Sequence, residues 1–186
     1  MKKFWPIALA LGLGFAGNAW AIKVAKVTIP DSAEVGGASL QLNGAGLRKV
    51  AFIKVYVGAL YLDAKVDSSD AVYANTGAKR VSMRMMRGLS AGKMRDAWTE
   101  GFEKNHTAAE FESIKAKIEQ FNGFFEDVED GDEIFIDFVP GEGTSVTIKG
   151  NKKGSIAGDD FNTALLKIWL GDEPADDNLK EAMLGG

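Results

Sequence analysis

The chain has 186 residues and a formal net charge of −4, and it contains no cysteine. A net acidic chain lacks the basic footprint that nucleic-acid binding needs, so we expect no nucleic-acid partner. Without cysteine the protein has no disulfides, and its hydrophobic core must hold the fold.

The first 21 residues have the layout of a secretory signal peptide. The chain begins Met-Lys-Lys, residues 4–17 are largely apolar, and an Ala-Trp-Ala run that fits the cleavage site ends at Ala21. The apolar run is shorter than the roughly 20 residues that a transmembrane helix needs. We therefore expect a signal peptide at residues 1–21 that is cleaved after Ala21. The mature protein is then a single domain at residues 22–186, located in the periplasm and without stable membrane insertion.

The first half of the mature chain is rich in strand patterns. Alternating residues at 22–30 predict the first strand, residues 31–37 a polar turn, and residues 38–43 a second strand. The glycine-rich residues 44–46 indicate a bend or bulge before a long strand at 51–63.

The long strand and the segment before it suggest a pocket. Every second residue from Ile53 to Tyr61 is apolar, which predicts a face that lies in the core. Because strand side chains alternate, Lys54 and Tyr56 share the opposite face. Arg48 follows the glycines a few residues earlier. An arginine and a tyrosine on a largely apolar wall suit a ligand with an anionic head and an apolar body.

Helices and strands then follow in separate runs. A short helix is expected at 68–75 and a strand at 79–87, and Ser90 is placed to cap a helix whose Met94, Trp98 and Phe102 form an apolar stripe. Thr107 begins a capping-box sequence that opens the next helix. Two strands joined by a hairpin, a short strand and two final helices are expected at 133–139, 144–149, 155–156, 160–171 and 176–184. Segregated runs of this kind favour an α+β fold with an antiparallel sheet.

Two sequence blocks near opposite ends of the mature chain carry a family resemblance. The first is Asn-Gly-Ala-Gly-Leu-Arg at 43–48 with Phe-Ile-Lys-Val-Tyr-Val-Gly-Ala-Leu-Tyr-Leu at 52–62. The second is Phe-Asn-Thr-Ala-Leu-Leu-Lys-Ile-Trp-Leu-Gly-Asp-Glu-Pro at 161–174, followed by Leu-Lys at 179–180. Together they resemble the chalcone isomerase superfamily, and most closely its bacterial chalcone-isomerase-like branch. The resemblance implies an open-faced β-sandwich, with helices packed on one face of a large antiparallel sheet.

The resemblance also implies a role for Arg48. The arginine after the Gly-Ala-Gly element is the family's ligand-contacting arginine. It faces a phenolate in the plant isomerases and holds a carboxylate in the fatty-acid-binding branch. Those binding relatives add a tyrosine, and Tyr56 falls at roughly that place. Lys54, on the same strand face, is a third candidate.

The positions that carry polar groups in the plant isomerases are different here. The family's strand threonine aligns with Tyr56, its catalytic tyrosine with Met94, its asparagine with Gly101 and its late threonine with Ile168. Met94, Gly101 and Ile168 offer no strong hydrogen-bond donor to an enolate. We therefore assign no catalytic residue.

These observations favour a non-catalytic periplasmic binding protein for an amphipathic anion such as a fatty acid. Arg48 and Tyr56 would hold the head group, with Lys54 as a third candidate for contact with the ligand. The apolar wall would come from Met94 and Ile168, with Met83, Met85, Trp98 and Trp169 as further candidates. Two alternatives stay open: an isomerase or lyase acting on an α,β-unsaturated carbonyl, with Arg48 stabilising an oxyanion, and an envelope accessory protein. With one histidine and no cysteine, we expect no metal and no cofactor.

Overall fold

The structure is a computed structural model that describes residues 21–186, so the predicted signal peptide lies outside the described residues except for Ala21. The strands are β1 (Ala21–Val24), β2 (Val27–Pro30), β3 (Ser32–Val35), β4 (Ala38–Val50), β5 (Ile53–Leu62), β6 (Lys79–Met85), β7 (Glu133–Val139), β8 (Gly143–Ile148) and β9 (Asn151–Ile156). The helices are α1 (Ser69–Ala74), α2 (Ala91–Asn105), α3 (Ala108–Asn122), α4 (Asp160–Leu170) and α5 (Asp177–Met183). Within residues 21–186, no helix is both long and apolar enough to cross a membrane.

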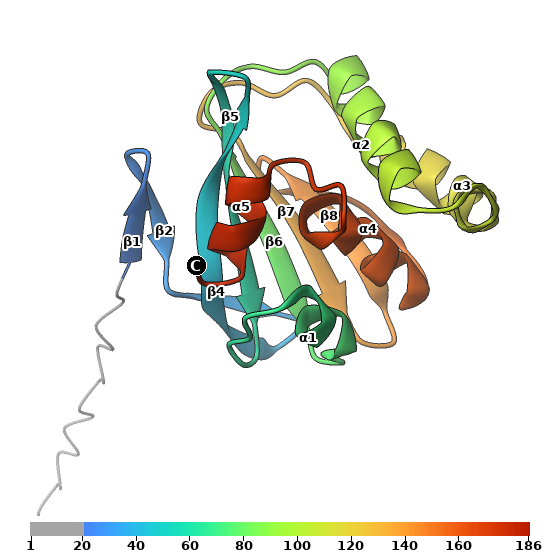
Figure 1. Ribbon diagram of the computed structural model, residues 1–186, viewed down its shortest axis with the longest axis horizontal. Coiled ribbons are helices and arrows are strands. Elements are labelled where there is room, and N and C mark those ends of the chain that lie inside the picture. Colours follow the sequence, from blue (N-terminus) through green and yellow to red (C-terminus); the bar gives the residue numbers. More distant parts are fainter. Residues whose placement is uncertain (1–20) are drawn as a thin grey trace, which may run out of the picture.

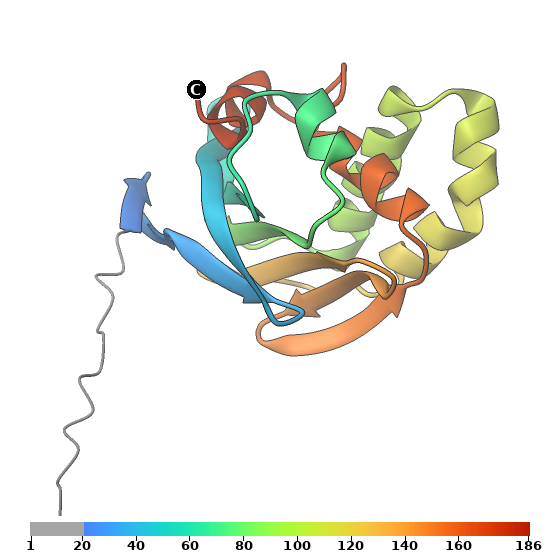
Figure 2. The same ribbon diagram turned by 90° about the horizontal axis from the view of Figure 1, so that it is seen from below.

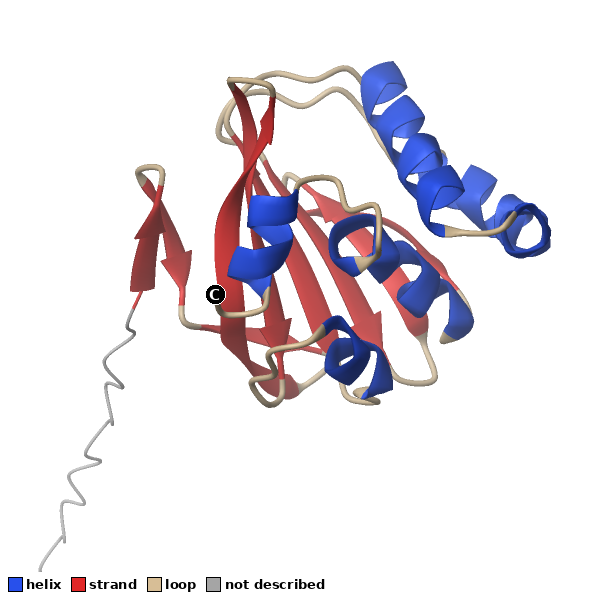
Figure 3. Ribbon diagram, viewed as in Figure 1, coloured by secondary structure: helices blue, strands red, loops and turns tan. Residues whose placement is uncertain are grey.

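A seven-stranded sheet organises the fold. Its strands run in the order β3-β4-β5-β6-β7-β8-β9, and each neighbouring pair is antiparallel. β1 and β2 form a separate two-stranded hairpin. The sheet curls around the helices, which all lie on one side of it (Figures 1 and 2). The colouring of Figure 3 makes the separation of strands and helices clear, and the predicted α+β sandwich is confirmed.

Both faces of the sheet are packed, and β5 is buried on both. Tyr56 and Leu60 belong to the core under the helices, whereas Val57 and Tyr61 belong to a second core on the outer face, which includes residues of the β1–β2 hairpin. The prediction of one core face was therefore incomplete, because the face that carries Tyr56 lies in the larger of the two cores. All buried apolar residues of the described chain lie from Ile29 onward.

The N-terminal strands differ from the sequence prediction. Residues 22–30 were expected to form one strand, but the chain reverses at Ala25 and Lys26, whose φ angles are 48° and 76°. Residues 31–37 were expected to form a turn, yet Ser32–Val35 pairs with β4. The apolar residues alternate at even positions before the first of these turns (Ile22, Val24) and at odd positions after it (Val27, Ile29), and this change of phase marks the reversal that one continuous strand would not have.

The glycines of β4 are required by the close approach of α5. A Cβ atom on Gly44 would collide with the backbone oxygen of Ala182, and one on Gly46 would lie 2.7 Å from the Cβ of the same alanine. The strand continues through this segment with a bulge at Asn43, as the glycines suggested. The Asn43 side chain donates a hydrogen bond to the Met183 oxygen at 2.7 Å. The Gly-Ala-Gly element therefore holds the last helix against the sheet.

The helices α2 and α3 form a hairpin inserted between β6 and β7. Ser90 caps α2 and Thr107 forms a complete capping box at α3, as predicted. The segments that enter and leave this hairpin are joined by two backbone hydrogen bonds between Leu89 and Val128, at 2.8 and 3.0 Å. The helical hairpin is thus tied to the sheet at its base.

Candidate ligand-binding site

Arg48 and Tyr56 lie directly opposite each other on β4 and β5. The guanidinium carbon of Arg48 is 5.6 Å from the centre of the Tyr56 ring, a distance suited to a cation–π interaction. Arg48 is half-buried and forms no ion pair with any carboxylate in residues 21–186. Its Nε atom is buried and has no hydrogen-bond partner among these described residues. The charge of Arg48 is therefore available to an anion.

A bulge next to Arg48 is held by Asp176, the residue that caps the N-terminus of α5. The pairing of β4 and β5 shifts between Arg48 and Lys49. The Lys49 backbone N–H donates to Asp176 Oδ2 at 2.8 Å, and Asp176 Oδ1 accepts from the Leu179 N–H at 3.1 Å. One carboxylate thus caps the helix and fixes the strand beside Arg48. The sequence predicted only a helix at residues 176–184, without either role for Asp176.

The Tyr56 hydroxyl lies deep in the core. The indole N–H of Trp169 donates to its oxygen at 2.8 Å. Burial raises the pKa of Tyr56 above its ordinary value, and the Arg48 charge and the Trp169 hydrogen bond offset part of that rise. Tyr56 is therefore a neutral phenol at physiological pH. Because an indole can only donate, the phenol retains its own hydrogen for another acceptor.

Arg48 and Tyr56 head a small cavity between the sheet, α2 and α4, of about 30 Å³. We call it the Arg48 cavity. Besides these two residues it is lined by Met83, Met85, Leu89, Met94, Ala97, Trp98, Ile168 and Ala175. Trp98 Nε1 is a second buried donor that has no hydrogen-bond partner in the part of the chain that the structure describes. The cavity thus combines one cation and two neutral donors with a largely apolar, methionine-rich wall.

The structure brings most of the predicted site residues together. Arg48, Tyr56, Met94 and Ile168 all line the Arg48 cavity. Lys54 does not line it, because the residue is exposed near the end of the β4–β5 hairpin, beyond the bulge.

Among the further candidates for the apolar wall, Met83, Met85 and Trp98 line the cavity. Trp169 lies behind Tyr56 and touches the site through its hydrogen bond. The sequence reasoning missed three cavity residues, Leu89, Ala97 and Ala175. Leu89 and Ala175 lie outside the helices and strands, and Ala97 is small, so none of them gave a pattern.

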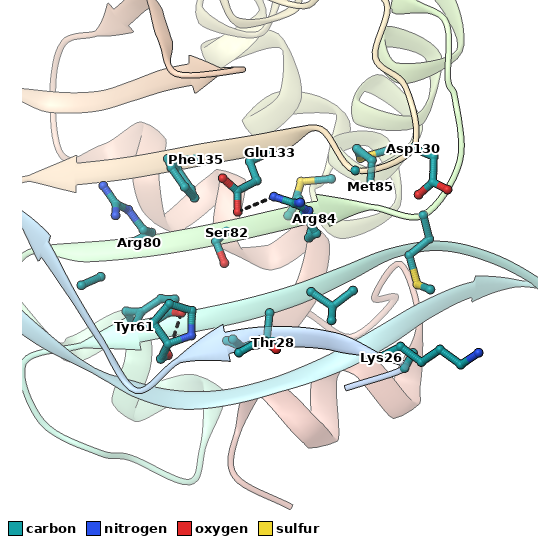
Figure 4. Close-up of a pocket in the computed structure, with 18 of the residues that line it drawn as sticks. Lys26, Thr28, Tyr61, Arg80, Ser82, Arg84, Met85, Asp130, Glu133 and Phe135 are labelled. Atoms are coloured by element: carbon teal, nitrogen blue, oxygen red, sulfur yellow. Dashed lines mark hydrogen bonds and ion pairs between the residues drawn. The ribbon is translucent and has the colours of Figure 1, made fainter. Parts of the chain in front are cut away.

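A larger hollow, of about 650 Å³, lies on the outer face of the sheet beside the β1–β2 hairpin (Figure 4). Its arginines are already paired. Arg80 forms two hydrogen bonds with Asp137, at 2.6 and 2.7 Å, and Arg84 lies 2.9 Å from Glu133. These carboxylates neutralise the charges of the two arginines, and the other cation of this hollow, Lys26, is exposed to solvent, so the smaller cavity is the better candidate.

Comparisons with known proteins agree with this architecture. The chain matches the model of the chalcone isomerase-like family over residues 21–185. It is similar to the crystal structure of a fatty-acid binding protein from Arabidopsis thaliana, with a TM-score of 0.70 and 21% sequence identity. The similarity covers 89% of this chain and 96% of the plant protein. No curated protein sequence matches the chain significantly.

Proposed function

Since the chain belongs to the chalcone isomerase-like family, we propose that it binds a fatty acid or a similar amphipathic carboxylate in the Arg48 cavity. One observation carries the proposal: Arg48 forms no ion pair within residues 21–186 and lies beside a neutral phenol, at the end of an apolar cavity. The plant protein that shares the fold is itself a fatty-acid binding protein, which supports this ligand class.

The chemistry of the head group follows from the two side chains. A guanidinium is always charged and can form a two-pronged hydrogen bond with a carboxylate. Tyr56 adds one neutral hydrogen bond, because its raised pKa keeps the phenol protonated. A carboxylate at this position would therefore accept hydrogen bonds from both residues, and its alkyl chain would extend among the methionines.

The cavity must widen to hold such a ligand. Its volume of about 30 Å³ is close to that of one water molecule in the liquid, whereas ligand pockets occupy roughly 300–1,000 Å³. Met83, Met85 and Met94 can repack because unbranched methionine side chains adapt to irregular spaces. The described state is then the closed form, and the alkyl chain takes the space that these side chains vacate.

The isomerase alternative finds less support at the same site. Met94 and Ile168 form part of the cavity wall, and a Cβ atom on Gly101 would lie 2.9 Å from an Ile168 methyl carbon. The positions that carry polar groups in the plant enzymes are therefore filled by apolar packing. We expect the rate of chalcone cyclisation to equal the spontaneous rate, and an Arg48-dependent acceleration would favour the enzyme instead.

The proposal includes export to the periplasm, with cleavage after Ala21 supported by the pattern of residues 1–21. N-terminal sequencing of the protein from a periplasmic extract should begin at Ile22. An intact Met1 in the soluble fraction would contradict this location.

Ligand binding itself is tested by titration calorimetry with palmitate and with methyl palmitate. The acid should bind more tightly than the ester, and equal affinities would show that no anion site is involved.

A further inference from the structure

The turn that joins β4 to β5 exposes apolar side chains to solvent. Phe52 is 90% exposed, and its neighbours Val50 and Ile53 are 52% and 41% exposed. Within residues 21–186, the other exposed large apolar side chain is Ile22, on β1. We call Val50, Phe52 and Ile53 the apolar tip. The concentration of exposed apolar side chains at one turn distinguishes it from singly scattered ones, which are normal on protein surfaces.

Two lysines lie directly behind the apolar tip. Lys49 and Lys54 are paired across the two strands, and the next pair toward the turn is Val50 with Ile53. Both lysines are exposed, and neither forms an ion pair in the part of the chain that the structure describes. The hairpin thus presents an aromatic apex, then an aliphatic pair, then a pair of cations. This order matches a bilayer, because the apolar side chains suit its apolar interior and the lysines suit its anionic head groups.

The apolar tip extends the same two strands that carry the Arg48 cavity. Arg48 precedes Phe52 by only four residues, which can span at most about 13 Å even if fully extended. In Figure 1 the turn lies at the end of the sheet where the segments joining β6 to α2 and α3 to β7 also emerge. A bilayer in contact with the turn would therefore face the end of the sheet where Arg48 lies.

The size of the apolar tip favours a lipid surface over a protein partner. A stable protein interface buries about 800 Å² on each partner, whereas one aromatic side chain buries roughly 150–250 Å². Three side chains at one turn fall short of that area. They suffice for shallow insertion into the boundary between head groups and acyl chains, where binding adds apolar burial to attraction by lysines.

We propose that the apolar tip inserts into the interface of a phospholipid bilayer that contains anionic lipids, with Lys49 and Lys54 at the level of the phosphates. The acidic chain as a whole is repelled by such a surface, but screening limits that repulsion to about 8 Å at physiological salt. Contact is therefore local and depends on the turn. The inference goes beyond ligand binding, and it holds whether or not a fatty acid occupies the Arg48 cavity.

Vesicle co-sedimentation tests the proposal with protein that begins at Ile22, which retains all the buried apolar residues of the described fold. The vesicles contain phosphatidylethanolamine and phosphatidylglycerol, without free fatty acid. Phe52→Ser should lower the partition coefficient about tenfold, since most of the apolar burial is lost. Lys49→Gln and Lys54→Gln should each lower it about fivefold, and vesicles of phosphatidylcholine alone should remove the lysine effect. The matched control Ile22→Ser should bind as the wild type does.

Fluorescence gives an independent readout. Phe52→Trp should show a blue shift when vesicles are added, and Ile22→Trp should show none. Absence of wild-type sedimentation, or equal sedimentation of the wild type and Phe52→Ser, would overturn the proposal. The proposal would also be overturned, in favour of a protein partner, if the Phe52→Trp variant is cross-linked to an envelope protein and its fluorescence shows no blue shift with vesicles. Arg48→Ala should sediment as the wild type does, so failure of fatty-acid binding and failure of membrane contact are distinguishable.

Discussion

The two faces of the sheet each carry a hollow and at least one arginine, but they differ in whether a carboxylate lies beside the arginine and neutralises its charge. On the outer face, Arg80 and Arg84 lie beside Asp137 and Glu133 in a hollow of about 650 Å³. On the helix side, Arg48 has no carboxylate partner among the described residues, and its cavity is about 30 Å³. The comparison teaches that volume and charge pairing rank the two hollows in opposite order, because the larger hollow is the one whose arginines lie beside carboxylates.

The largest expected effect comes from removing Arg48, and the removal of an arginine on the outer face serves as its comparison. Arg48→Ala should weaken palmitate binding on the order of ten- to a hundredfold, because a hydrogen bond to a charged group contributes roughly 1.5–3 kcal/mol. Arg84→Ala on the outer face should change the affinity less than twofold. Titration calorimetry measures both, with circular dichroism to check folding. A larger loss from Arg84→Ala would place the head group on the outer face.

Introducing a phenylalanine side chain into each hollow provides the next test. Ala97 is partly buried in the wall of the Arg48 cavity, and Ala97→Phe should lower palmitate affinity about tenfold by occupying the path of the alkyl chain. Ser82 lines the outer hollow, and Ser82→Phe should leave the affinity unchanged. If Ser82→Phe is the variant that loses binding, the assignment of the two faces must be reversed.

A smaller effect is expected from the buried hydroxyl of Tyr56. Tyr56→Phe should weaken binding several-fold, since it removes one neutral hydrogen bond worth about 1 kcal/mol. It should also lower the free energy of unfolding by about 1–3 kcal/mol, because the Trp169 N–H loses its acceptor in the core. Tyr61→Phe is the control for affinity. It removes a hydroxyl on the outer face that donates a hydrogen bond to the Pro30 oxygen at 3.0 Å, and it should leave palmitate affinity unchanged. Urea unfolding and calorimetry separate the two consequences.

The smallest effect concerns alkaline pH. Burial raises the pKa of Tyr56, and it raises the pKa of Tyr61 to about 12. An acid whose pKa is higher in the folded state stabilises the fold below the unfolded value of 10, and this stabilisation is lost as pH rises above that value. Wild-type stability should therefore fall between pH 10 and about 12. The fall should be shallower in Tyr56→Phe, and equal slopes would show that Tyr56 titrates normally.

Sequence patterns predicted the features that depend on neighbouring residues. The helix that begins after Thr107 has its capping box, and β6 alternates as expected. The pairing of Arg48 with Tyr56 was not predicted, because the expected strands ended at residue 43 and began at residue 51, whereas β4 continues to Val50 and turns at residues 51–52.

Features that depend on distant segments could not be predicted. The turn at Ala25 and Lys26 contains no glycine or asparagine, the usual residues at positive φ, so its residue types did not mark it. The burial of both faces of β5 requires the β1–β2 hairpin on one side and helices on the other. Asp176 reaches Lys49 from 127 positions away, and its part in shaping the site is visible only in three dimensions.

The central claim is that an anionic head group binds Arg48 on the helix side of the sheet. Nuclear magnetic resonance of the arginine Nε–H groups, recorded while palmitate is added, tests it most directly. The Arg48 Nε is buried and unpartnered, so its signal should move as the carboxylate arrives, and it is assigned by its disappearance in Arg48→Lys. The account predicts a large shift for Arg48 and no shift for Arg80 or Arg84. Shifts confined to Arg80 and Arg84, with Arg48 unchanged, would contradict it.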